Sequence, residues 1–144
     1  MSLEVLLMLV ICSYTDYKTR MIDLRVVYFF LLLNILMRGR MEIEPVGLLL
    51  SLIPGMMLMT VRLIKKTAIG EGDLHIFIAL GIMTGFYHCL MLLLLSSVLL
   101  LLYGVFYIWP LKKERDRSVP FVPFILLSHV VISLVGYREE MGFL

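Results

Sequence analysis

Long runs of apolar residues constrain the fold of this chain more than any other feature. The stretch "LMLLLLSSVLLLLYGVFYIW", at positions 90–109, contains no charged side chain. A helix of roughly 20 apolar residues spans the hydrocarbon core of a bilayer, which is about 30 Å thick. Of the 144 residues, 61% are hydrophobic, and the mean hydropathy is +1.00, whereas soluble domains are about half apolar. The chain is therefore expected to be a polytopic protein embedded in a lipid bilayer.

Six hydrophobic segments predict an all-α fold of six transmembrane helices in a single domain, 1–144. The stretch "FYHC" at 86–89 is expected to turn the fourth segment into the fifth. One helix through 74–109 is the alternative, which is disfavoured because it greatly exceeds one span. Pro54 and Gly55 are expected to kink the third segment. The segments lie at about 2–15, 24–37, 46–64, 74–89, 90–109 and 120–137.

Basic residues gather on alternate connections between these segments. If the N-terminus lies outside, ten lysines and arginines fall on inner connections and three on outer segments. Cytoplasmic connections of membrane proteins carry such an excess of positive charge. We therefore expect a multi-pass protein of the inner (cytoplasmic) membrane with both termini outside. The inner set is Lys18, Arg20, Arg25, Arg62, Lys65, Lys66, Lys112, Lys113, Arg115 and Arg117, and the outer set is Arg38, Arg40 and Arg138.

The cysteines and the N-terminal segment exclude other classes of protein. Cys12 and Cys89 form no CxxC pair and no His/Cys cluster with metal-ligand spacing. They are expected to be free thiols, with no disulfide framework and no metal site. The N-terminal segment lacks a basic leading region and a small-residue cleavage site, so it is interpreted as the first span rather than a signal peptide. No nucleic-acid partner is expected.

Two aspartates are predicted to meet at the inner membrane face. Asp16 ends the first segment and Asp73 begins the fourth, which puts both at one depth. Like charges a few ångströms apart do not both ionise cheaply, so one pKa rises. The ionised carboxyl can then act as general base toward water, while the protonated one polarises a carbonyl and donates its proton. This is the chemistry of aspartic peptidases, and it needs no metal or organic cofactor.

Other interpretations of these aspartates stay open on sequence alone. Asp73 also suits the first turn of a helix, where the positive end of the helix dipole favours a carboxylate. Asp16 also suits an ion pair with Lys18 or Arg20. A small proton-coupled transporter or assembly subunit, a different class of function, also uses intramembrane carboxylates. A transporter more often has them near mid-membrane, so the shared depth at one face favours the peptidase.

The stretch "GEGDLHIFIALG" at 70–81 leads into Asp73 through two glycines, which let another chain approach the backbone closely. A substrate peptide lying extended across the aspartates needs such access, although an ordinary helix-start turn fits as well. The stretch resembles the GxGD segment of the type IV prepilin peptidases, membrane aspartic peptidases that include the preflagellin peptidases. His75 stands where that family usually has lysine. The matching residues are Gly70, Gly72, Asp73, Ala79 and Gly81.

Two further motifs resemble the same family. The stretch "DYKTRMID" at 16–23 is similar to its first aspartate motif, in which Ile-Pro follows the aspartate six residues later. Asp16 and Ile22 match, and Asp23 replaces the proline. The stretch "VPFVPF" at 119–124 resembles the family's Ile-Pro-Phe-Gly-Pro-Phe, with Val122 replacing the glycine. The three motifs occur in the family's order and cover most of the six-segment core.

The resemblance implies an aspartic endopeptidase with Asp16 and Asp73 as catalytic residues. It implies that the substrate is a pilin-like precursor, cut on the cytoplasmic side between a short basic leader and a hydrophobic helix. Many relatives also methylate the new N-terminus through a region with paired CxxC motifs. These 144 residues contain no CxxC motif, so cleavage without N-methylation is expected here. A homo-oligomer stays open. Substrate-binding residues are expected at Gly70, Glu71, Gly72, Pro120, Phe121 and Pro123.

The remaining polar residues are mostly given structural roles. His75 lies about 200° round a helix from Asp73 and so does not share its water. His88 and His129 are expected to be structural. The GxxxG "GIMTG" at 81–85 predicts close helix packing, which can bring the fourth segment against the first. Asp23 is expected to pair with Arg20 or Arg25, and the charge of a basic leader is expected to fall on Glu71, Asp23 or Glu114.

Overall fold

The structure is a computed structural model that describes residues 3–38, 45–65, 69–108 and 119–141. Every regular element in these residues is a helix, which confirms the predicted all-α class. The elements are α1 (Leu3–Thr19), α2 (Leu24–Arg38), α3 (Pro45–Ser51), α4 (Ile53–Ile64), α5 (Glu71–Thr84), α6 (Phe86–Tyr103), the π-helical turn η1 (Gly104–Ile108) and α7 (Val122–Met141).

The third hydrophobic segment is broken, as the proline predicted. Helix α3 ends at Ser51, and α4 begins at Ile53 with Pro54 in its first turn. Proline lacks the N–H that would continue the hydrogen-bond ladder, so the two short helices meet at Leu52.

The fourth and fifth segments are separate helices, so the alternative of one helix through 74–109 is wrong. The turn between them lies at Gly85, whose φ of 85° belongs to the left-handed region that favours glycine. The stretch "FYHC" forms the first turn of α6 and does not make the connection itself. The turn therefore lies just before the predicted position, because Gly85, and not the aromatic stretch after it, adopts the backbone conformation that reverses the chain.

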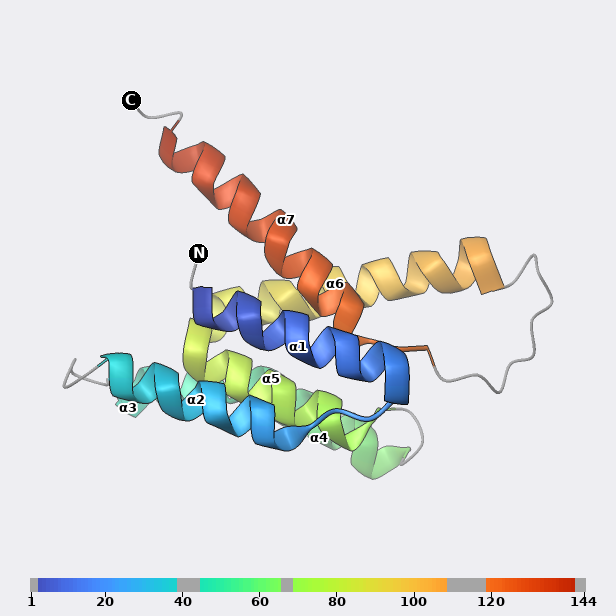
Figure 1. The fold of residues 1–144 in the computed structure, drawn as a ribbon, viewed down its shortest axis with the longest axis horizontal. Helices are drawn as coiled ribbons and strands as arrows, with labels where there is room; N and C mark the ends of the chain where they lie inside the picture. The colour runs from blue at the N-terminus through green and yellow to red at the C-terminus, as the bar shows by residue number, and fades with distance from the viewer. Residues whose placement is uncertain (1–2, 39–44, 66–68, 109–118, 142–144) are drawn as a thin grey trace.

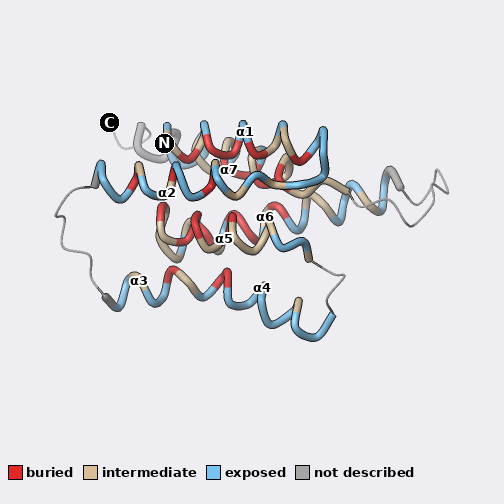
Figure 2. Tube along the Cα trace, turned by 60° about the horizontal axis from the view of Figure 1, so that its bottom comes forward, coloured by how far each residue is buried: buried red, intermediate tan, exposed pale blue. Residues whose placement is uncertain are grey.

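Helix α5 is the centre of the bundle. It packs between α2 and α4 and also contacts α6. Helix α1 packs against α2 and α7, and α7 also packs along α6. Figure 2 shows the buried residues on the facing sides of α1, α5 and α6. The core is apolar, and its largest fully buried side chains include Met8, Phe77, Leu80 and Leu92.

The GxxxG of α5 packs differently from the prediction. A side chain added at Gly81 would overlap the backbone carbonyl oxygen of Ser51, so this glycine admits the end of α3 rather than α1. Gly85 has no neighbour within 4 Å of an added Cβ and serves the turn instead. The close approach predicted by the motif is therefore present, but its partner is a different helix.

Two helical stretches in the described residues are long and apolar enough to cross a membrane. They are Val46–Ile64 and Phe86–Phe106, while Leu24–Met37 and Val122–Gly136 are apolar but shorter. Large hydrophobic side chains such as Leu36, Leu101 and Leu134 are more than half exposed. Such a surface suits lipid better than water. The full set of six spans stays a prediction.

One end of the bundle gathers several helix ends. In Figure 1, α1 and α4 end on the right, where α2, α5 and α7 begin. The basic residues Lys18, Arg20, Arg25, Arg62 and Lys65 lie at or next to these helix ends. The other five inner basic residues and Glu114 lie outside the described residues.

Candidate active site

Asp16 lies in the last turn of α1 and is buried, with a relative exposure of 7%. The backbone N–H of Val122, the first residue of α7, donates a hydrogen bond of 3.1 Å to Oδ2 of Asp16. A second backbone hydrogen bond comes from Phe121. The first N–H groups of a helix have no partner within the helix and carry a partial positive charge. The carboxyl of Asp16 therefore caps α7 from a neighbouring helix.

Asp73 is the third residue of α5, which begins at Glu71 directly after Gly70. Gly70 is the residue before the helix, and its extended backbone starts α5 without a side-chain cap. A backbone hydrogen bond from Gly70 reaches the carboxyl of Asp73. The first turn of α5 therefore turns its second carboxylate inward, since Glu71 is exposed and Asp73 is half-buried.

The two aspartates interact although they come from different helices. Burial raises the pKa of Asp73 to about 6, and the negative charge of Asp16 contributes to this rise. Burial also raises the pKa of Asp16, but the hydrogen bonds from Val122 and Phe121 and the charge of Arg20 oppose it. Two backbone donors therefore favour the ionised form of Asp16, while Asp73 accepts one such bond, from Gly70, and its pKa still rises to about 6.

Glu71 and Gly72 have neighbours of their own in the first turn of α5. Glu71 forms an ion pair with Arg62 of α4, and the Glu71 side chain is still 78% exposed. A Cβ at Gly72 would lie 2.7 Å from the side chain of Ile22, between α1 and α2. The close approach at Gly72 is therefore made by the chain itself, while Gly70 is exposed.

The residues expected from the "VPFVPF" stretch lie at the start of α7. Pro120, Phe121 and Pro123 are all half-buried. The ring of Phe121 packs against Phe77 of α5, with the ring centroids 6.0 Å apart. Proline is favoured in the first turn of a helix because no donor is lost there. This stretch therefore joins α7 to α5 through Phe121 and to α1 through Asp16.

Two further polar contacts of α2 were not predicted with their partners. Asp23 accepts a hydrogen bond of 3.0 Å from the backbone N–H of Arg25 and so caps α2, a pattern that aspartate before a helix signals. Asn34 of α2 donates to Glu4 of α1 at 2.7 Å, which links these helices at their other ends.

His75, His88 and His129 each contact the aromatic ring of another helix. His88 Nε2 of α6 lies 3.3 Å from His129 Nδ1 of α7, which fits the expected structural role. His75 Nδ1 lies 2.9 Å from the hydroxyl of Tyr28 on α2. The sequence carries no signal for this second pair, because the two residues are 47 positions apart.

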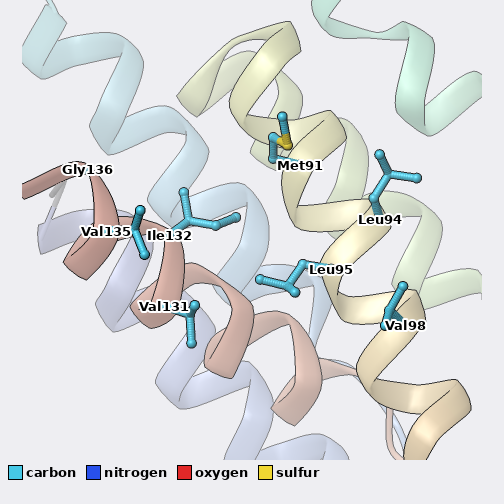
Figure 3. Close-up of a pocket in the computed structure, with 8 residues that line it drawn as sticks. All are labelled: Met91, Leu94, Leu95, Val98, Val131, Ile132, Val135 and Gly136. Carbon is cyan, nitrogen blue, oxygen red and sulfur yellow. The ribbon is translucent and has the colours of Figure 1, made fainter. Parts of the chain in front are cut away.

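An apolar pocket lies away from the aspartates, between α6 and α7. Its volume is about 570 Å³. Figure 3 shows its lining side chains, which are aliphatic except for the thioether of Met91. It contains no group able to transfer a proton, so the aspartates are the better candidate for chemistry. In the described residues, no three His, Cys, Asp or Glu side chains gather as a metal site would require.

Comparisons with known proteins agree with the two aspartate motifs, at 16–23 and 70–81, whereas the third motif lies beyond the matched residues. The type IV leader peptidase family matches residues 3–105, which contain both aspartates. A prepilin leader peptidase/N-methyltransferase of Legionella pneumophila is 32% identical over 71 residues, covering 49% of this chain and 25% of the relative. The match thus spans about a quarter of that relative's length, and no solved structure matches. The chain belongs to the type IV leader peptidase family.

Proposed function

We propose that this protein is a membrane aspartic endopeptidase that removes the leader of a type IV pilin-like precursor. The observation that carries the proposal is the electrostatic interaction between Asp16 and Asp73, which lie 57 positions apart in sequence. Asp16 accepts two backbone hydrogen bonds, which favour its ionised form, while the pKa of Asp73 is raised to about 6 despite its bond from Gly70. Environments that separate the pKa values of two neighbouring carboxyls are the mark of an acid–base pair.

In the proposed reaction, Asp16 begins ionised and Asp73 begins protonated. Asp16 removes a proton from a water molecule, whose oxygen attacks the scissile carbonyl carbon while Asp73 donates its proton to the carbonyl oxygen. A tetrahedral diol results. Asp16 then gives its proton to the leaving nitrogen as the C–N bond breaks, and a diol hydroxyl returns a proton to Asp73. Both carboxyls end as they began, so no cofactor is consumed.

The proposed substrate has a short basic leader followed by a hydrophobic helix. Glu71 and Asp23 are exposed carboxylates near the aspartate pair and are proposed to attract the leader. Gly70, Gly72, Pro120, Phe121 and Pro123 are proposed to shape the path of the peptide. The helix of the precursor would lie in the same bilayer as the peptidase, and cleavage would occur at the cytoplasmic face. The proposed topology has six spans, with both termini on the outer, non-cytoplasmic side of the inner membrane.

We propose cleavage without N-methylation by these 144 residues, because Cys12 and Cys89 are buried free thiols on separate helices. The test is co-expression with a pilin-like precursor encoded in the same genome. Mass spectrometry of the product is expected to show a shortened chain with an unmodified new N-terminus. A precursor that keeps its leader would contradict the peptidase, and a methylated product would contradict only the second part.

A further inference from the structure

The hydroxyl of Tyr28 and the Nδ1 of His75 lie 2.9 Å apart and join two helices near the aspartate pair. The rings also meet edge to face, with centroids 6.0 Å apart and an interplanar angle of 67°. When the imidazole carries its proton on Nε2, Nδ1 accepts the hydrogen bond from Tyr28. The contact therefore fixes α5 against α2 by both a directional bond and ring packing.

His75 lies two residues after Asp73 in α5. Successive helical residues are 100° apart, so these two side chains point to different sides of the helix. His75 faces α2, while the carboxyl of Asp73 interacts with Asp16 of α1. Any effect of His75 on the aspartates is therefore transmitted through the position of the helix.

The beginning of α5 has few other polar attachments. Gly70 supplies no side-chain cap. The ion pair between Arg62 and Glu71 involves a carboxylate that is 78% exposed, and exposed pairs contribute little to stability. The contact of Gly72 with Ile22 limits how closely α5 approaches but does not hold it. Tyr28 is also half exposed, but its contact with His75 adds ring packing to the hydrogen bond and is therefore well placed to fix the first two turns.

Resting on the peptidase function proposed above, we propose that Tyr28 and His75 are positioning residues, which hold the first turn of α5 so that Asp73 faces Asp16. Neither residue touches the reacting atoms. The pair acts as a unit, because either member alone leaves α5 without the bond. Its loss shifts Asp73 relative to Asp16 and to the scissile carbonyl.

The test compares the full-length variants Tyr28→Phe, His75→Leu, their double variant and His75→Asn in cleavage of a pilin-like precursor. Each single loss is expected to lower kcat by about 10- to 100-fold, because small misplacements of reacting groups cost that much. KM should stay within about twofold, since substrate contacts are unchanged. His75→Asn should keep most of the rate, because its amide oxygen also accepts a hydrogen bond. Tyr17→Phe, which changes an exposed ring on α1, is the matched control.

A second readout does not depend on cleavage. Carbodiimides modify protonated carboxyls, so peptide mass spectrometry of Asp73 labelling against pH follows its proton. In Tyr28→Phe and His75→Leu the midpoint should move below the wild-type value, because Asp73 moves away from Asp16 and toward water. Tyr17→Phe and His75→Asn should keep the wild-type midpoint.

Unchanged kcat and an unchanged midpoint in Tyr28→Phe and His75→Leu would overturn the positioning role. The positioning role would also be overturned if the double variant lost the product of the two single losses of kcat. Either substitution alone already removes the shared contact, so the second should cost little more. If the wild-type protein cleaves no precursor, the proposed function fails, and the labelling midpoint alone then decides whether the pair positions Asp73.

Discussion

The backbone N–H of Val122 donates to Oδ2 of Asp16 at 3.1 Å, across 106 positions of sequence. This bond ties the end of α1 to the start of α7. The start of α7, which contains the third sequence motif, thereby stabilises a charged carboxylate at the candidate active site.

Removing this donor should impair the peptidase without removing the helix. Val122→Pro lacks the N–H but suits the first position of a helix. Because hydrogen bonds to charged groups are worth about 1.5–3 kcal/mol, kcat/KM should fall by about 10- to 100-fold. Val122→Ala keeps the donor and is the control for the lost side chain. Equal activity of the two variants in precursor cleavage would show that the bond has no part in the reaction.

The rate of cleavage should depend on pH in a defined direction. Burial and the charge of Asp16 raise the pKa of Asp73 to about 6, and in the proposed reaction Asp73 begins protonated. We therefore expect kcat/KM to fall as pH rises through about 6, and to fall again in acid when Asp16 gains a proton. Initial rates of the detergent-solubilised protein across this range measure both limbs. A rate that increases through pH 6 would contradict the assignment of Asp73 as the acid.

The ion pair of Arg62 and Glu71 should control the affinity for a basic leader. If Glu71 receives the leader, Arg62 competes with it for the same carboxylate. Arg62→Gln should then lower KM for a leader rich in lysine, whereas Glu71→Gln should raise it, and kcat should change little in both. A leader with its lysines replaced by glutamine is the matched control substrate. If KM is the same in both variants as in the wild-type protein, Glu71 does not bind the leader.

Much of the helical architecture could be predicted from the sequence. Long apolar runs such as 90–109 predict a helix. The break before Pro54 was also predictable, because proline lacks the N–H that would continue the helix. The turn at Gly85 was displaced, since the aromatic "FYHC" continues a helix as readily as it ends one. The six spans stay a prediction, because two stretches of the described residues, Val46–Ile64 and Phe86–Phe106, have the length and hydropathy of a span.

Only those parts of the candidate site that depend on local sequence patterns could be predicted. Charge bias alone predicted that Asp16 and Asp73 lie at one membrane face, and their catalytic roles remain proposals. The donor at Val122 and the contact of Tyr28 with His75 depend on which helices pack together. Asp23 was expected to pair with Arg20 or Arg25, and the structure gives it a backbone hydrogen bond from Arg25 that caps α2. Its place before a helix was the signal for this role.

The most direct test of the central claim is processing of a co-expressed pilin-like precursor by Asp16→Asn and Asp73→Asn. Each asparagine keeps the shape of the side chain but can neither accept nor release the required proton. We expect each variant to reach the membrane in wild-type amounts and to leave the precursor uncut, while the wild-type protein removes its leader. Leader removal by either variant at the wild-type rate would contradict the aspartate pair.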